Sequence, residues 1–180
     1  MLQTYQWGTL KSYTGWHPIQ QVWRENGELV AAALVLERTI PIKGFSSLVR
    51  IMYVPKGPLL LNWHDQQLRL RIFEELKTLA RKRHAIFIKI DPDIPLATGS
   101  AQDVTHLEND LLGLATIADL TSLAWVYSKE QIQFRNTIRL DLTLSDDHLL
   151  SQMKQKTRYN IVYNTLLFSF QFIIFHIFKV

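Results

Sequence analysis

The first forty residues show one helix-like pattern followed by two strand-like patterns. Residues 6–13 predict a short helix that stops near Gly15. Residues 19–24 and 29–37 then predict two strands joined by Asn26-Gly27. Both residues of that dipeptide accept the positive φ of a type I′ turn, so the pair is a strong hairpin signal. The second strand is apolar on both faces, which predicts a central position in a sheet.

The middle of the chain predicts a strand, a long helix and another strand. Residues 48–54 form an apolar run that Lys56-Gly57-Pro58 interrupts. Asn62 is the expected N-cap of a helix that reaches about residue 84, with leucine and isoleucine at helical spacing. Residues 85–90 are a short apolar strand that ends at Asp91-Pro92.

The last part of the patterned chain predicts one more helix, two strands and a closing helix. We expect a helix over 103–120 and strands at 125–127 and 137–142. Ser145 is the expected N-cap of a final helix that includes residues 154–159. This order of elements predicts a mixed α/β fold around one sheet.

Composition narrows the possible functions only a little. With 180 residues and 47% hydrophobic content, the chain can bury one substantial core. It has no cysteine, which excludes a disulfide scaffold, and its six histidines are too scattered for a local metal motif. We therefore assign no metal. A net charge of +4 fits a protein that handles polyanions, but ordinary enzymes have similar values.

Residues 162–180 differ from everything before them. They read VYNTLLFSFQFIIFHIFKV, an apolar tail rich in Phe and Ile. A membrane span needs roughly 20 apolar residues, so the tail is short for one, and we expect membrane association only if it inserts. Residues 1–7 lack the features of a signal peptide, and the expected location is cytoplasmic. We expect the tail neither to complete the sheet nor to stabilise it.

Four short islands, in this order, resemble the FemABX family of peptidoglycan bridge-forming transferases. The islands are LQTYQWG with Lys11, PKGP at 55–58, FIKIDP at 87–92, and IQFRNT at 132–137 with the basic stretch MKQKTRYNI at 153–161. The resemblance covers residues 2–161. It implies an α/β, acetyltransferase-like (GNAT-like) domain with a mixed sheet flanked by helices. We expect that domain at 1–144, the opening helix of a second, mostly missing domain at 145–161, and an aberrant apolar tail at 162–180.

The resemblance also implies an activity and its partners. Members of this family transfer an amino acid from aminoacyl-tRNA to the stem peptide of a muramyl-peptide precursor that is UDP- or lipid-linked. An alternative is a truncated, non-catalytic remnant of such a transferase, and a weaker one is a basic nucleic-acid-binding module. No cofactor is expected. Acyl-CoA enzymes hold a pyrophosphate on a glycine-rich turn, and no two glycines here are close enough to build one.

Asp91 is the candidate catalytic residue. It follows a strand directly, a common place for a functional side chain in α/β folds, and it matches a family island. A turn-forming Asp-Pro pair explains the same position equally well. An ordinary aspartate is too weak a base to deprotonate an alkylammonium, since their pKa values differ by about 6.5 units. We therefore expect Asp91 to bind and orient the attacking amine, with base action only late in the reaction.

Four cations are candidate substrate-binding residues. The resemblance implies that Lys11, one helical turn after Trp7, contacts the precursor, although a solvated lysine is the plain alternative. Lys56 and Lys89 are secondary candidates, and Lys89 should point to the opposite face of its strand from its neighbours. Arg158, with Lys156 beside it, can reach a phosphate, but a solvated helix face accounts for both.

Overall fold

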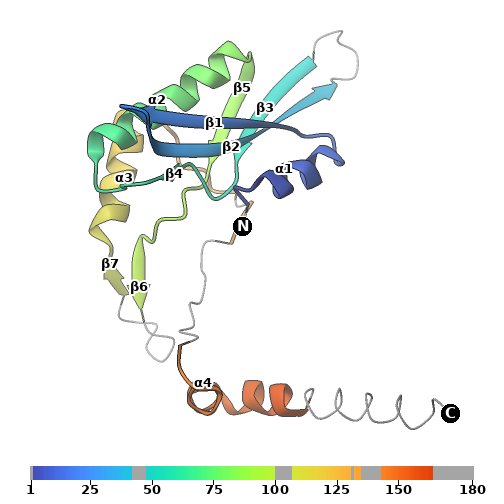
Figure 1. Cartoon of the computed structure of the whole chain (residues 1–180), viewed down its shortest axis with the longest axis vertical. Helices are drawn as coiled ribbons and strands as arrows, with labels where there is room; N and C mark the ends of the chain where they lie inside the picture. Colours follow the sequence, from blue (N-terminus) through green and yellow to red (C-terminus); the bar gives the residue numbers. More distant parts are fainter. Residues whose placement is uncertain (1, 42–47, 100–106, 131, 135–142, 164–180) are drawn as a thin grey trace, which may run out of the picture. The chain divides into compact units, whose positions relative to one another are not determined.

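A computed structural model describes residues 2–41, 48–99, 107–130, 132–134 and 143–163 of the chain (Figure 1). The chain divides into two compact units, Met1–Asn136 and Thr137–Val180. The first unit contains a mixed sheet with helices on both faces, as the sequence predicts. The expected domain boundaries at residues 144 and 161 stay a prediction.

The sheet has the strand order β1-β2-β3-β5, and the short β4 also pairs with β2. Neighbouring strands are antiparallel except β3 and β5, which are parallel. The strands are β1 (His17–Glu25), β2 (Glu28–Pro41), β3 (Leu48–Val54), β4 (Leu59–Leu60) and β5 (Ala85–Ile90). The predicted hairpin is confirmed, because Asn26 and Gly27 have φ values of 50° and 87°. The predicted central position of β2 is confirmed as well.

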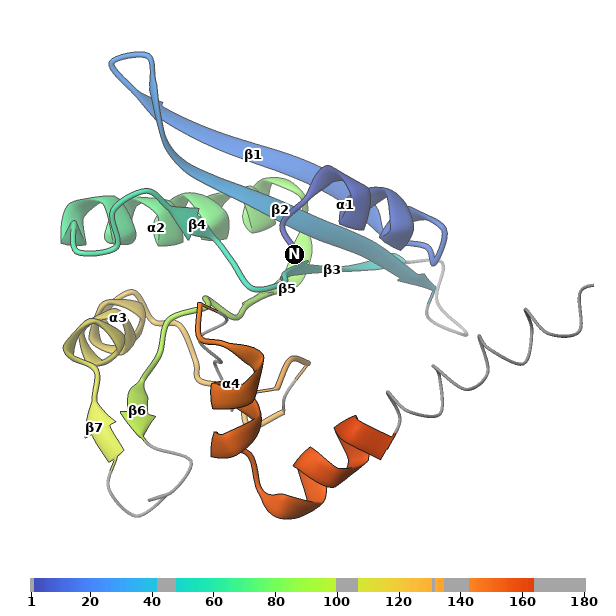
Figure 2. The same ribbon diagram turned by 60° about the horizontal axis from the view of Figure 1, so that its bottom comes forward.

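Two helices cover opposite faces of the sheet (Figures 1 and 2). They are α1 (Tyr5–Ser12) and α2 (Gln66–Lys82). Successive side chains of β2 alternate between the faces. Ala33 and Val35 join the core under α2, whereas Leu34 and Leu36 form the cluster on which Trp7 of α1 packs. The sheet is therefore buried on both sides around β2.

The predicted start of the long helix is wrong by a few residues. Asp65, and not Asn62, is the N-cap of α2, because its carboxylate accepts from the backbone N–H of Leu68. The Asn62 side chain accepts from His64 N at 3.0 Å instead. It therefore stabilises a turn before the helix, the alternative role that Asn commonly takes.

Two other predictions in this unit are wrong. The helix expected over 103–120 is present from Leu111, where Asp110 caps α3 (Leu111–Ser122), but the prediction is wrong for residues 107–110, and residues 103–106 lie outside the described residues. The residues just before it form β7 (Leu107–Asn109), which pairs with β6 (Ala97–Gly99). Residues 125–127 are not a strand, since the chain leaves α3 through Ala124 at φ 57°. The strand expected at 137–142 lies outside the described residues.

The second unit contains two short helical segments. Ser145 caps α4 (Asp146–Gln152), as predicted. The helix does not continue through 154–159, because Met153 is extended, with ψ 150°. A separate helical segment follows at 155–163. Within the described residues, no helix is both long and apolar enough to cross a bilayer. Most of the apolar tail, from residue 164 on, lies outside them.

Candidate functional site

Polar side chains meet where the parallel strands β3 and β5 end. Tyr53 is the second-last residue of β3, and it pairs in register with Lys89 of β5. Asp91 follows β5 directly. Carboxyl ends of parallel strands are the usual place for a site in an α/β sheet, because the loops that leave them lie side by side. The structure therefore places Asp91 where the sequence predicts a functional carboxylate.

Both oxygens of Asp91 accept hydrogen bonds from within the chain. The Tyr53 hydroxyl donates to Oδ2 at 2.8 Å, and the backbone N–H of Lys56 donates to Oδ1 at 2.5 Å. Burial raises the pKa of Asp91 above its ordinary value, and these two hydrogen bonds together with the charges of Lys56 and Lys89 partly oppose that rise. Asp91 is thus an oriented carboxylate that is a stronger base than a free aspartate.

Tyr53 is a fixed donor in this arrangement. Its side chain is buried in the cluster under α1. Burial raises the pKa of its phenol far above the ordinary value, the hydrogen bond with Asp91 raises it further, and a hydrogen bond with Gln133 lowers it. The phenol therefore keeps its proton at every physiological pH. The hydroxyl donates this proton to Asp91, which helps to hold the carboxylate in place.

The two secondary lysines are tied to neighbouring chain segments. Lys56 has φ 50°, an uncommon value for a residue with a side chain, and its Nζ lies 3.0 Å from Asp93 Oδ1. The ammonium of Lys89 donates to Glu130 O at 2.8 Å and to Ser128 Oγ at 3.1 Å. Both lysines are therefore cations beside Asp91 that also hold the loops of the site.

Lys89 lies on the face that the sequence predicts. Ile88 and Ile90 pack against the core under α2. Lys89 points the other way, toward the face of α1 and Tyr53.

Lys11 lies on α1, over the same face of the sheet as Tyr53. Its ammonium is 4.8 Å from the centroid of the Trp7 ring, a cation–π contact. Trp7 in turn packs against the cluster that contains Tyr53. Lys11 is therefore anchored to this face through Trp7, but it does not belong to the hydrogen-bonded group around Asp91.

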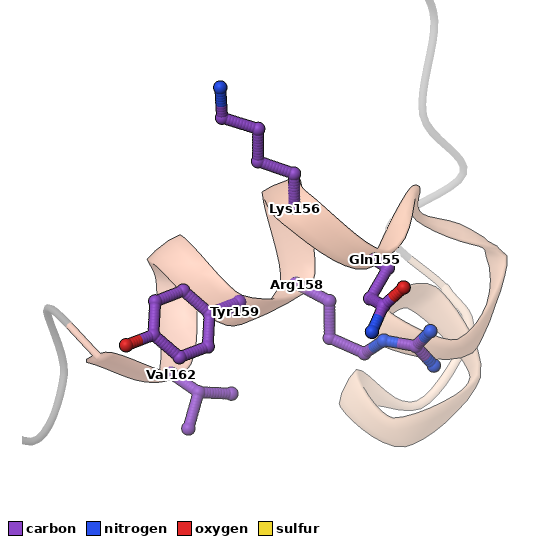
Figure 3. Close-up of a pocket in the computed structure, with 5 residues that line it drawn as sticks. All are labelled: Gln155, Lys156, Arg158, Tyr159 and Val162. Carbon is purple, nitrogen blue, oxygen red and sulfur yellow. The ribbon is translucent and has the colours of Figure 1, made fainter.

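Arg158 belongs to the second unit. It lies on the helical segment 155–163 and lines a shallow hollow on its surface (Figure 3). The other lining residues are Gln155, Lys156, Tyr159 and Val162. In Figure 3 the Arg158 side chain extends toward Gln155, whereas Lys156 extends away from it. The structure thus brings together Asp91, Lys56 and Lys89, and it places Arg158 in a separate unit.

Three residues of the site were not predicted as functional. The sequence pattern shows Tyr53 only as part of an apolar strand, and Gln133 only as part of a motif. Gln3 is likewise only part of the first island in the sequence, yet its side chain bonds to both β2 and the 55–58 turn. The signal available in the sequence was their position, because each lies in or beside one of the four islands. No group of three or more His, Asp or Glu side chains that could hold a metal occurs among the described residues.

Comparison with known proteins identifies the fold and the family. The chain is 28% identical over 159 residues to the lipid II:glycine glycyltransferase of Staphylococcus haemolyticus (strain JCSC1435). It is 25% identical to the enzyme of the same name from Staphylococcus aureus (strain MRSA252). Each alignment covers 88% of this chain, which spans only 35% of the length of these relatives.

Structural likeness points the same way. The crystal structure of FemX superposes with a TM-score of 0.61 and 19% identity, over 88% of this chain and 37% of that one. The likeness confirms the predicted acetyltransferase-like α/β class, with its mixed sheet flanked by helices. The model of the FemAB family matches residues 1–165. The chain therefore belongs to the FemAB family.

Proposed function

We propose that this chain belongs to a transferase that joins an aminoacyl group to an amine on a peptidoglycan precursor. Its contribution is Asp91, which binds that amine. The aminoacyl donor is aminoacyl-tRNA, and the acceptor is the stem peptide of a UDP- or lipid-linked muramyl peptide. Family membership supports the reaction class, and the relatives that carry the name lipid II:glycine glycyltransferase support the acceptor. The reaction takes place on the cytoplasmic side of the membrane. The observation that carries the proposal is the oriented carboxylate of Asp91.

Asp91 binds the acceptor amine as an ammonium ion. An ionised carboxylate offers about four lone-pair positions, and Tyr53 and Lys56 N–H occupy two of them. The remaining positions can accept from an ammonium. For ordinary groups, moving a proton from a lysine-like ammonium to an aspartate costs roughly 9 kcal/mol. Burial raises the pKa of Asp91 and narrows this gap. Base action then becomes feasible once the amine has begun to attack and its acidity has risen.

The cations Lys11, Lys56 and Lys89 serve the phosphates of the precursor. Lys11 is the primary candidate, because Trp7 fixes its helix on the face that also carries Tyr53. Lys56 and Lys89 contribute positive potential beside Asp91 while they hold their loops. Arg158 is proposed to bind phosphate as well, on the helical segment 155–163. A pyrophosphate is bound by such charges even where each side chain is solvated.

A binding titration with a UDP-linked muramyl peptide tests the proposal. We expect weak binding that Lys11→Ala and Asp91→Asn each reduce further. Lys82→Ala is the matched control, because Lys82 ends α2 on the opposite face of the sheet. The decisive ligand is the same precursor with its acceptor amine acetylated. If the acetylated and free forms bind equally well, or if Asp91→Asn has no effect on the free form, the ammonium role of Asp91 is wrong.

A transfer assay separates the active enzyme from the non-catalytic alternative. The chain is mixed with the precursor and with radiolabelled aminoacyl-tRNA, and the label that enters the precursor is counted. Transfer that Asp91→Asn abolishes supports the proposed reaction. Precursor binding without any transfer favours the non-catalytic remnant.

A further inference from the structure

A single peptide group lies between Gln3 and Asp91. The Gln3 amide donates through Nε2 to the carbonyl oxygen of Pro55 at 2.5 Å. The N–H of Lys56 donates to Asp91 Oδ1, also at 2.5 Å. The carbonyl of residue 55 and the N–H of residue 56 belong to the same planar peptide unit. Gln3 and Asp91 therefore bind the two ends of one peptide dipole.

Gln3 is itself held in place from the sheet. Its Oε1 accepts from the backbone N–H of Leu34 at 2.7 Å, and its Nε2 also reaches the Leu34 carbonyl at 3.5 Å. On the other side it fills the space beside Gly57, where an added Cβ would lie 2.7 Å from Nε2. Gln3 thus connects the central strand β2 to the turn after β3, and a side chain at residue 57 would displace it.

The peptide that Gln3 binds has an uncommon backbone setting. Lys56 has φ 50°, and a non-glycine residue in this region is strained. Such a conformation persists only when the surroundings determine it. Here the surroundings are the Gln3 amide on the carbonyl side of the peptide and the Asp91 carboxylate on its N–H side. The same two contacts fix the orientation of the N–H toward Asp91.

We propose that Gln3 is a positioning residue for Asp91, acting through the peptide between Pro55 and Lys56. Donation to the carbonyl polarises the peptide and strengthens the hydrogen bond from its N–H to the carboxylate. Gln3 therefore favours the ionised, oriented state of Asp91 without touching the substrate. This role rests on the function proposed for Asp91, but it can be measured without any substrate.

The test is a pH titration of the Asp91 carboxyl carbon by NMR, in the full chain labelled with carbon-13. Gln3→Met has a similar length and removes all three hydrogen bonds of the Gln3 side chain without adding a charge. We expect it to raise the pKa of Asp91 by about 0.3 to 0.5 unit and to weaken the hydrogen bond of the Lys56 amide. Thr9→Val is the matched control, because it removes the exposed side-chain hydrogen bond from Thr9 Oγ1 to the Tyr5 carbonyl on the same helix. An unchanged Asp91 titration in folded Gln3→Met overturns the inference, as does an equal shift in Thr9→Val.

A second variant covers the case in which Gln3→Met does not fold. Gln3→Glu keeps an acceptor for Leu34 N and replaces the Nε2 donor to the Pro55 and Leu34 carbonyls with a second carboxylate oxygen. The amide proton shift and exchange rate of Lys56 then report the hydrogen bond to Asp91. Faster exchange than in wild type supports the inference, and unchanged exchange overturns it. Neither measurement uses the precursor, so a failure of precursor binding leaves the result on Gln3 intact.

Discussion

Removing the carboxylate of Asp119 should destabilise the first unit strongly. Arg69 of α2 and Asp119 of α3 form a buried ion pair, with each side chain only 4% exposed. Asp119 Oδ2 accepts from Arg69 Nε at 2.7 Å and lies 2.6 Å from Arg69 Nη2, while Oδ1 accepts from Gln66 at 2.8 Å. In Asp119→Ala, Arg69 keeps its hydrogen bond to the Trp63 carbonyl but loses its counter-charge.

The size of the effect follows from the loss of that counter-charge. Breaking a buried ion pair by removing one partner costs about 3–5 kcal/mol, because the other charge stays buried and uncompensated. For a protein of this size, that loss lowers the melting temperature by roughly 6–20 °C. Replacing both partners with apolar side chains, as in Arg69→Met with Asp119→Leu, removes the charge as well. That double variant should be within about 1 kcal/mol of wild type or more stable.

Urea unfolding followed by circular dichroism gives the free energy of unfolding of each variant. Glu74→Ala is the matched control, because it breaks the partly exposed pair with Lys77 at 3.1 Å and should cost less than about 1 kcal/mol. A cost below about 1 kcal/mol for Asp119→Ala would show that Arg69 is not a buried charge. A double variant several kcal/mol less stable than wild type would show that the pair is itself strongly stabilising.

Four further predictions concern the site and the tail. Because the pKa of Asp91 is raised, the folded state binds the Asp91 proton more tightly than the unfolded state does, and this stabilises the fold at low pH. The stabilisation is complete below the pKa of Asp91 in the unfolded chain, about 4, and is lost as the pH rises through the folded pKa. Unfolding measured from pH 3 to 8 should show this loss in wild type and not in Asp91→Asn. Gly57→Ala should cost about 1–3 kcal/mol in a urea titration, because its Cβ would displace Gln3. Acetyl-CoA should leave the melting temperature unchanged, whereas a ligand at about 100 times its Kd adds roughly 2.7 kcal/mol. Deleting the chain after Ile161 should improve solubility in a sedimentation assay without lowering the melting temperature, since the apolar, nearly uncharged tail favours association.

The sheet was predictable because its signals are local. The alternation of apolar residues and the Asn26-Gly27 turn fix β1 and β2 within one short stretch of sequence. The helix starts were less predictable, because Asn62 and Asp65 are both good caps and the sequence does not show which one faces the free N–H groups. At residues 107–109, pairing with β6 determines a strand where local pattern favoured a helix.

The site was predictable in part for the same reason. Asp91 and Lys56 lie in short motifs at strand ends, where a functional residue is expected. Tyr53 and Gln3 contribute through contacts with residues 38 and 52 positions away in the sequence. Neither periodicity nor spacing reports contacts of that kind. Which polar residues share a proton or bind a common peptide is decided only when the strands are brought together.

The alternation of β2 side chains between the two faces of the sheet has a consequence for folding. Ala31, Ala33 and Val35 face α2 whereas Leu34 and Leu36 face α1, so a one-residue slip would exchange the two sets. The leucines would then crowd the core under α2, and alanines would leave a gap beneath α1. The hairpin turn sets the register between β1 and β2, and it closes only a very short loop. Pairing of β3 with β5 closes a much longer loop, because the chain passes through α2 between the two strands. We therefore expect the hairpin to form early. Its register then determines, before either helix docks, which side chains each face of the sheet presents to α1 and α2.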